Sequence, residues 1–351
     1  MTATIRQLDM KQALTKIMGN HDLTREEARS VMDIIMSGEA TSSQIAGVAT
    51  ALRMKGETKD EITGFAEAMR SFSSQLNTNR EGLLDTCGTG GSGIHKFNIS
   101  TSSAIIAAAA GIRVAKHGNR AMSGKAGSAD VLEALGVNIN LTPEQGAACL
   151  DQAGICFMFA QLYHPSLKHA AAPRRELGVR TIFNILGPLA NPAGADRQLV
   201  GLYDRSQTEL VAGVLGELGL KRALVVGSYD GLDEISISEP TRVSELLDGQ
   251  VRTYDLSPEE IGLKRYPLSD VIGGDASTNA AIIRSIFSGN ERGAYREIVL
   301  ANAAACIFVG GAASSLKEGV RVAAEIIDSG AAQRKLETLI QTTGELAHVS
   351  K

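Results

Sequence analysis

The chain has 351 residues, which exceeds the size at which one hydrophobic core usually keeps growing, so two domains are expected. A formal net charge of −4 gives no overall attraction for nucleic acid or anionic lipid, so an anionic ligand must be bound by a local site. The N-terminal stretch is interrupted by charges, no apolar run is long enough to cross a membrane, and the four cysteines lack paired spacing. We therefore expect a cytoplasmic protein with reduced thiols and with neither a membrane nor a nucleic acid as partner.

Residues 1–75 are predicted to form a small helical domain. A threonine followed three residues later by Glu or Gln is the signal of a capping box, and it occurs here at Thr24 with Glu27, Thr41 with Gln44, and Thr58 with Glu61. Apolar residues at helical spacing follow these signals. The polar stretch 71–82 is then expected to connect this domain to a second one.

Residues 76–351 are predicted to form a larger α/β domain. Expected strands are 83–87, 112–118, 155–160, 197–204 and 222–227, and expected helices are 99–110, 127–135, 143–153, 207–218 and 275–288. This alternation predicts a mostly parallel central sheet covered by helices on both faces. The helical segment 166–186 has no strand before the next helix, so it is expected to return to the helical domain.

The stretch DTCGTGGSGIHKFNIST (85–101) leads from a strand through a glycine turn into a helix. Its glycines formally match the dinucleotide pattern, but the next strand ends in Lys116 and His117 instead of an acidic residue, and the P-loop lysine is absent. Glycines allow backbone N–H groups to approach an anion, and the helix N-terminus favours negative charge. The turn is therefore interpreted as a phosphate site.

A second loop, KHGNRAMSGKAGSAD (116–130), follows the adjacent strand and carries Lys116, Arg120 and Lys125 among glycines and serines. Two such loops at neighbouring strand ends fit a ligand with more than one phosphate. Such a ligand usually brings a divalent cation, and Asp233 and Glu234 in the loop 227–236 are candidate oxygen ligands for Mg²⁺. A solvated acidic turn is the alternative for this pair.

Several stretches, in one order along most of the chain, together resemble the anthranilate phosphoribosyltransferase family of tryptophan biosynthesis. They are CGTGGSGIHKFNIST (87–101), AKHGNR (115–120), AGSADVLEALGV (126–137), HPSLKHAAAPRRELGVRTIFNILGPLANPAG (164–194) and DGLDEIS (230–236). The resemblance implies a homodimer through the helical domains. It also implies transfer of the 5-phosphoribosyl group from phosphoribosyl pyrophosphate to the amine of anthranilate, with Mg²⁺ as cofactor and release of pyrophosphate.

The resemblance also implies the site residues. Phosphoribosyl pyrophosphate would be bound by Gly88, Gly91, Ser92, Lys96, Asn98, Ile99, Ser100, Thr101, Lys116, His117, Gly118, Asn119, Arg120, Ala121, Met122, Ser123, Gly124 and Ser128. Anthranilate would be bound by Gly88, His117, Asn119, His164, Arg174 and Pro188, with Arg174 as partner of its carboxylate. Magnesium would be held by Ser100, Asp233 and Glu234.

Two positions depart from the family pattern. The family usually has Asp where this chain has Ser92, and Thr or Ser where it has Lys96. The first change predicts weaker inhibition by excess Mg²⁺ than a Ser92→Asp variant shows, and the second could supply a charged contact to pyrophosphate.

No residue is required to be a strong base. His117 is a candidate proton relay, although shaping the aromatic channel is the preferred role. Cys87 is expected to pack, because no basic partner accompanies it. Two other interpretations of the function stay open: a pyrimidine nucleoside phosphorylase-like enzyme and a non-catalytic binding paralogue.

Overall fold

The computed structural model describes residues 8–91, 93–121 and 125–348. Its N-terminal unit consists of α1 (Met10–Met18), α2 (Arg25–Ser37), α3 (Ser42–Lys55) and α4 (Lys59–Ser71). The three predicted capping boxes are confirmed at the starts of α2, α3 and α4, each with reciprocal bonds between the threonine and the third helical residue. These bonds satisfy backbone N–H groups that have no partner inside the helix, so each start is fixed by local sequence.

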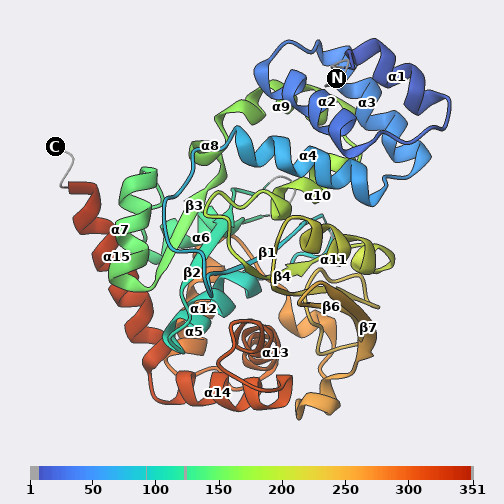
Figure 1. Cartoon of the computed structure of the whole chain (residues 1–351). Coiled ribbons are helices and arrows are strands. Elements are labelled where there is room, and N and C mark those ends of the chain that lie inside the picture. The colour runs from blue at the N-terminus through green and yellow to red at the C-terminus, as the bar shows by residue number, and fades with distance from the viewer. Residues whose placement is uncertain (1–7, 92, 122–124, 349–351) are drawn as a thin grey trace.

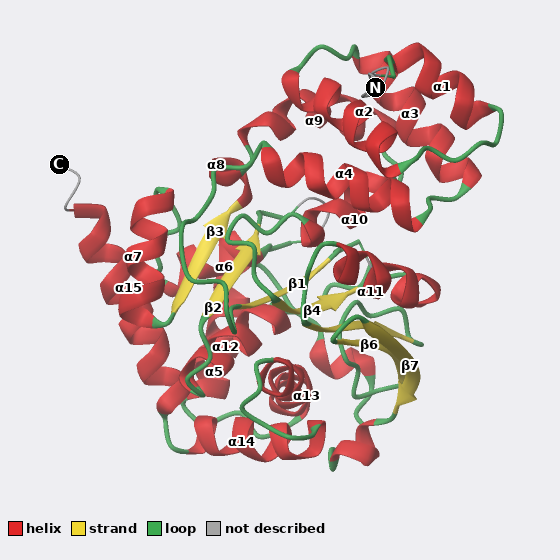
Figure 2. Cartoon of the chain, viewed as in Figure 1, coloured by secondary structure: helices red, strands yellow, loops and turns green. Residues whose placement is uncertain are grey.

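A mostly parallel sheet forms the centre of the larger unit (Figure 2). Its strands in the described chain are β1 (Leu84–Gly88), β2 (Val114–Gly118), β3 (Ile155–Phe159), β4 (Arg197–Gly201), β5 (Arg222–Ser228), β6 (Thr241–Leu247) and β7 (Gln250–Leu256). They lie in the order β3-β2-β1-β4-β5-β6-β7. The neighbours from β3 to β5 are parallel, as predicted, whereas β6 and β7 are antiparallel.

The strands β6 and β7 were not among the predicted elements. They form a hairpin around Asp248 and Gly249, whose φ angles of 46° and 82° belong to a turn of the type that Asp-Gly favours. The hairpin lies at the edge of the sheet, and β7 alternates exposed and partly buried residues instead of forming an apolar run. A search restricted to apolar strands misses such an edge pair.

Helices cover both faces of the sheet. The five predicted helices are present as α5 (Ile99–Ala109), α6 (Ser128–Leu135), α7 (Pro143–Ala153), α11 (Thr208–Glu217) and α12 (Ala276–Phe287). The chain ends with α13 (Ala294–Val309), α14 (Leu316–Asp328) and α15 (Ala331–His348). Along β5, Leu224 and Val226 belong to one hydrophobic core while Ala223 and Val225 belong to the other. Because successive side chains of a strand point to opposite faces, both faces must be covered. The predicted fold class is confirmed.

The segment that follows β3 returns to the N-terminal unit (Figure 1). It comprises α8 (Ala160–Tyr163), α9 (Lys168–Leu177) and α10 (Ile182–Leu189). Helix α9 contacts α2 and α3, and α10 contacts α3 and α4. Ala170, Phe183 and Leu186 share a hydrophobic core with α1 to α4 and with one face of the sheet. The domain division at residues 75 and 76 stays a prediction.

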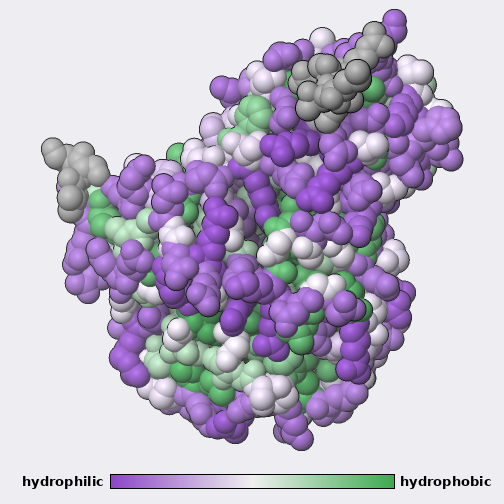
Figure 3. All heavy atoms as spheres, in the orientation of Figure 1, coloured by the Kyte–Doolittle hydropathy of each residue, from purple (hydrophilic) through white to green (hydrophobic). Residues whose placement is uncertain are grey.

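Polar side chains cover much of the face seen in Figure 3, including the region where the helical unit meets the larger body. Among the helices of residues 8–91, 93–121 and 125–348, none has both the length and the apolar character that a membrane crossing requires.

Candidate active site

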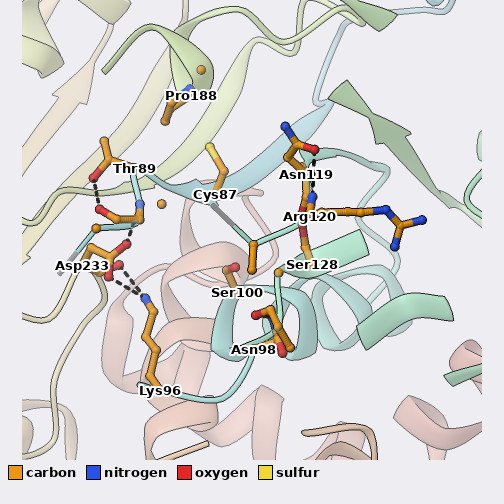
Figure 4. A pocket seen from close by; sticks show the side chains of 18 of the residues that line it. Cys87, Thr89, Lys96, Asn98, Ser100, Asn119, Arg120, Ser128, Pro188 and Asp233 are labelled. Carbon is orange, nitrogen blue, oxygen red and sulfur yellow. Dashed lines mark hydrogen bonds and ion pairs between the residues drawn. The ribbon is translucent and has the colours of Figure 1, made fainter. Parts of the chain in front are cut away.

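A cavity of about 410 Å³ opens where the helical unit faces the carboxyl ends of β1 and β2 (Figure 4). The loop after β5 closes one side of it, and residues of α4, α9 and α10 line the other. In open parallel sheets, ligands bind at this edge, because the loops there are free to vary without disturbing the core. The cavity therefore lies where the sequence predicts a ligand.

The glycine turn forms the floor of the cavity. It follows β1, and Gly90, Gly91 and Gly93 have φ angles of 65°, 75° and 76°, a left-handed conformation that glycine adopts without strain. The turn leads to α5, whose first residues, Ile99 and Ser100, line the cavity. Helix N-termini carry unsatisfied N–H groups and a partial positive charge, so this floor is suited to an anion.

Asn98 joins the loop after β1 to the loop after β2. Its side-chain oxygen accepts a hydrogen bond from Asn279 at 3.0 Å, and its Nδ2 donates to the carbonyl of Ala126 at 3.4 Å. In the second loop, the Ser128 hydroxyl donates to the carbonyl of Asn119 at 3.3 Å. The loops are thus tied together, so their donors face one cavity.

Lys116 supplies a buried cation at the end of β2. Its ammonium donates to the carbonyl of Thr86 and to the hydroxyl of Ser100, the latter at 3.3 Å. The carboxylate of Asp85 lies beneath it, accepting from the backbone N–H of His117 at 3.1 Å and from the side-chain amide of Gln198 at 3.1 Å. Burial raises the pKa of Asp85, while the charge of Lys116 opposes that rise. Neither Asp85 nor Gln198 was predicted as a site residue, because both lie inside strands that the sequence indicates as part of the core sheet.

Asp233 is held against the ends of two strands. Its Oδ2 accepts a hydrogen bond from the backbone N–H of Gly90 at 3.0 Å. A Cβ atom at Gly88 would lie 2.6 Å from that oxygen, and one at Gly201 would lie 2.0 Å from the Asp233 carbonyl. Both strands must therefore end in glycine for this loop to reach the cavity.

Lys96 lies between the two predicted metal ligands. Its Nζ is 2.8 Å from Asp233 Oδ1 and 2.8 Å from Glu234 Oε1 (Figure 4 shows the pairing with Asp233). Burial opposes the charge of Lys96, but the attraction of Asp233 and then of Glu234 outweighs it and raises the pKa of the ammonium. The lysine is therefore charged beside these carboxylates.

The opposite wall is largely apolar and carries the guanidinium of Arg174. Arg174 in α9 lies over the ring of Phe183 at 5.5 Å and forms no ion pair with any residue in the described ranges. Burial lowers its pKa, although an arginine stays charged. Met69 of α4 and Pro188 of α10 complete this wall. The wall can bind a flat apolar group that carries a carboxylate.

Two histidines stack beside the strand ends. The rings of His117 and His164 have centroids 4.9 Å apart. Burial and the neighbouring His164 lower the pKa of His117 to about 3, and burial lowers the pKa of His164 to about 4. The Nδ1 of His117 faces the carbonyl of Gly187 at 3.3 Å, and within the described residues its buried Nε2 has no partner. His117 is therefore neutral at pH 7 and offers Nε2 as an acceptor.

The structure gathers most predicted site residues on this one cavity. Those that line it are Gly88, Gly91, Lys96, Asn98, Ile99, Ser100, Lys116, His117, Gly118, Asn119, Arg120, Ala121, Ser128, Arg174, Pro188, Asp233 and Glu234. Thr101 is buried inside α5 and His164 lies behind His117. Ser92, Met122, Ser123 and Gly124 lie outside the described residues.

Arg120, a predicted ligand of the sugar donor, is paired within the protein. Its guanidinium forms ion pairs with Asp130 at 2.9 Å and with Glu133, both in α6. Cys87 lines the cavity, but burial raises the pKa of its thiol well above the usual range, which opposes a nucleophilic role.

Several lining residues were not predicted. Met69, Phe183, Asn184 and Gly187 come from helices of the helical unit and its return segment, and Gly274 comes from the loop before α12. In the sequence these residues look like ordinary members of packed helices and turns, so local patterns do not distinguish them from residues of the hydrophobic core.

These features define a glycosyl transferase: residues 11–73 match the family model described as the helical bundle domain of the glycosyl transferase family, and residues 80–333 match its a/b domain. Anthranilate phosphoribosyltransferase of Brevibacillus brevis is 52% identical over 96% of this chain and 99% of its own. That of Moorella thermoacetica is 51% identical over 94% and 97%. The chain therefore belongs to the anthranilate phosphoribosyltransferase family, and the predicted resemblance is confirmed.

Solved structures agree with this assignment. Anthranilate phosphoribosyltransferase from Thermus thermophilus has a TM-score of 0.90 and 43% identity, covering 94% of this chain and 99% of that chain. The Saccharomyces cerevisiae protein, in complex with PRPP and Mg, has a TM-score of 0.87 and 25% identity over 96% and 98%.

The donor set at the carboxylate pair suits magnesium only in part. Two carboxylates and the hydroxyl of Ser100 are hard oxygen ligands of the kind Mg²⁺ prefers. Across the described ranges, however, no group of three or more His, Cys, Asp or Glu side chains is arranged to hold a metal ion. Further ligands would have to come from a substrate or from water.

Proposed function

We propose that the chain transfers the 5-phosphoribosyl group from phosphoribosyl pyrophosphate to the amine of anthranilate, releasing pyrophosphate, as a step of tryptophan biosynthesis. One observation carries the proposal. A single cavity has anion donors and cations on its sheet wall, and an apolar wall on its helical side with Arg174, which has no ion-pair partner in the described part of the chain. The two walls match a polyanionic sugar donor and an aromatic acid, and few other substrate pairs combine these properties.

The donor is proposed to bind at the sheet wall. The glycine turn after β1, the start of α5 and the loop after β2 supply N–H and hydroxyl donors, and Lys116 supplies charge. Groups fixed in position before the reaction stabilise developing negative charge without reorganising. Bound in this way, the diphosphate becomes a better leaving group while the sugar becomes oxocarbenium-like.

The acceptor is proposed to bind at the helical wall. Arg174 would hold the anthranilate carboxylate, while Met69, Phe183 and Pro188 enclose the ring. The neutral Nε2 of His117 would accept a hydrogen bond from the amine and so orient its lone pair toward the sugar. The pKa of about 3 makes His117 a weak base, which supports positioning over proton removal.

Magnesium is proposed to accompany the donor, with Ser100, Asp233 and Glu234 as the predicted ligands of this chain. When bound, it would neutralise charge on the leaving diphosphate. The ion pairs of Lys96 with both carboxylates bear directly on this part of the proposal.

We also infer a homodimer formed through the helical domains. Met18 at the end of α1 is 76% exposed and Met54 near the end of α3 is 84% exposed. Exposed methionines are common at contact surfaces, because their flexible side chains adapt to a partner. Sedimentation of the purified protein and of a Met54→Lys variant tests this, since the variant should sediment as a monomer. The free thiols suit the expected cytoplasmic location.

Anthranilate fluorescence tests the function. Purified protein mixed with anthranilate, phosphoribosyl pyrophosphate and Mg²⁺ should consume the fluorescent acceptor and release one pyrophosphate per acceptor consumed. Omission of the sugar donor is the control. Binding of both compounds without any consumption would refute the proposal and favour a binding protein.

A further inference from the structure

Lys96 is the cation that holds Asp233 and Glu234 in this protein. Its ammonium is 2.8 Å from an oxygen of each carboxylate, and it also donates to the Asp233 carbonyl at 3.3 Å. The side chains of Asp233 and Glu234 are only 2% and 5% exposed, and that of Lys96 is 17% exposed. Buried carboxylates need a compensating charge, and here a side chain of the same chain supplies it.

The backbone around Lys96 is fixed by neighbours from the far end of the domain. Lys96 forms a β-bridge with Ile272, and the N–H of Gly273 donates to the carbonyl of His95 at 2.6 Å. Phe97 is fully buried and packs edge-on against the ring of Tyr295 at 5.2 Å. The fold therefore fixes the backbone from which the Lys96 side chain extends, while its flexible stem leaves the ammonium able to turn toward another partner in the cavity.

An ammonium and a divalent ion exclude each other at this pair. Both would compete for Asp233 Oδ1 and Glu234 Oε1, and at a few ångströms in a buried site their repulsion is strong. The N–H of Gly90 donates to Asp233 Oδ2, which holds this carboxylate in place beside the ammonium. A metal ion can bind here only if Lys96 moves away.

We propose that Lys96 is a resident cation that closes the Asp233–Glu234 pair to divalent ions until the sugar diphosphate arrives. The diphosphate then offers the ammonium a second polyanionic partner within the same cavity, which Lys96 lines, and the pair becomes available to the ion that accompanies the donor. Lys96 is thus a positioning residue that couples metal binding to donor binding. This rests on the proposed function only for the identity of the diphosphate.

Binding of Mn²⁺ alone to the protein without substrates tests the proposal. Electron paramagnetic resonance counts the free ion during titration of chelator-treated wild type, Lys96→Thr, Lys96→Arg and Lys221→Met. The Thr variant should bind Mn²⁺ at least about tenfold more tightly than wild type, a difference of about 1.4 kcal/mol. The Arg variant keeps the charge and should bind weakly, as wild type does.

Lys221→Met is the matched control. Lys221 is an exposed lysine just before β5, at the amino ends of the strands, whereas the cavity lies at their carboxyl ends. Its loss should therefore leave Mn²⁺ binding unchanged. Wild type that binds Mn²⁺ as tightly as Lys96→Thr would overturn the proposal.

The thermal stability of the Lys96→Thr variant provides a second test of the proposal. Without the ammonium, the two buried carboxylates repel each other, so the variant should melt at a lower temperature in chelator and regain stability with Mn²⁺, whereas wild type should respond little. A destabilised variant that Mn²⁺ does not restore would overturn the proposal. Neither measurement uses the sugar donor or anthranilate. An inactive wild type would therefore refute the transferase function without deciding whether Lys96 closes the carboxylate pair to divalent ions.

Discussion

The two walls of the cavity are built in different ways. On the sheet wall, Lys116 is buried and Lys96 is half-buried, and their ammonium groups contact carboxylate, carbonyl and hydroxyl oxygens. On the helical wall, Arg174 has no acidic partner among the described residues. The two lysines of the sheet wall are therefore already bonded before any ligand binds, whereas the guanidinium of the helical wall has no counter-charge.

This difference indicates how one cavity can keep two substrates apart. A polyanion gains most from several fixed cations and N–H groups, because each contact is strengthened by charge. An aromatic acid gains from a dry apolar surface with one guanidinium. Changes on one wall should therefore alter the binding of one substrate and leave the other nearly unchanged.

Loss of Lys116 should have the largest effect. Lys116→Met removes the buried cation next to Ser100 and leaves Asp85 without its neighbouring charge. We expect affinity for phosphoribosyl pyrophosphate to fall at least about a hundredfold, or about 3 kcal/mol. Isothermal calorimetry with the donor measures this, with Lys221→Met as the exposed control. An equal loss of anthranilate affinity would contradict the separation of the walls.

Arg174→Ala should have the next largest effect on substrate binding and act on the other substrate. Removing a charged partner of a carboxylate costs about 2 kcal/mol, so the KM for anthranilate should rise about thirtyfold. The KM for the sugar donor should change less than about threefold. Arg175→Ala is the matched control, because the adjacent arginine is exposed and does not line the cavity.

The neutral histidines predict a loss of stability in mild acid. The unfolded chain protonates His164 near pH 6.5, whereas in the folded protein its pKa is about 4. Because the unfolded state binds more protons between these values, this contribution to stability is present above pH 6.5 and is lost as the pH falls toward 4. It amounts to about 3 kcal/mol.

Urea unfolding at several pH values measures that loss. A His164→Gln variant lacks the titrating group, so its free energy of unfolding should fall less than that of wild type between pH 6.5 and 4. Parallel curves for the two proteins would mean that His164 is accessible to protons in the folded state.

Phe183→Leu should have the smallest effect. The aromatic face beneath Arg174 is lost while the apolar volume is largely kept, and a cation–π contact is worth about 1 kcal/mol. We expect the KM for anthranilate to rise about fivefold at constant KM for the donor. If the donor's KM responds instead, Phe183 belongs functionally to the sheet wall.

Much of the fold was predictable because its signals are local. The capping threonines of α2, α3 and α4 form the expected bonds within three residues of themselves. The apolar strands of the parallel sheet and the glycine turn are recognised from neighbouring residues alone. The β6–β7 hairpin was not predicted because polar residues interrupt both strands and β7 alternates at the edge of the sheet, although Asp248 and Gly249 carried a turn signal.

The site was less predictable where its members come from distant segments. Resemblance to the family placed Arg174, Lys116 and Arg120 on the list of site residues, but it could not show that α6 pairs with the Arg120 guanidinium in the structure. The contacts of Lys96 with residues almost 140 positions away follow from the packing of the loop after β5 against the loop after β1 and from the loop at 272–274. The spacing of residues along the sequence does not predict such contacts.

The sequence by itself determined the helix starts, the parallel core strands, the glycine turn and the family, because each depends on short-range geometry or on residue order. Only the tertiary structure decided that Lys96 neutralises Asp233 and Glu234, that the rings of His117 and His164 lie side by side, and that Arg174 has no acidic partner among the residues described. The physical reason is that charge compensation and burial depend on distances through space, which the chain sets only after its sheet and its returning helices have packed.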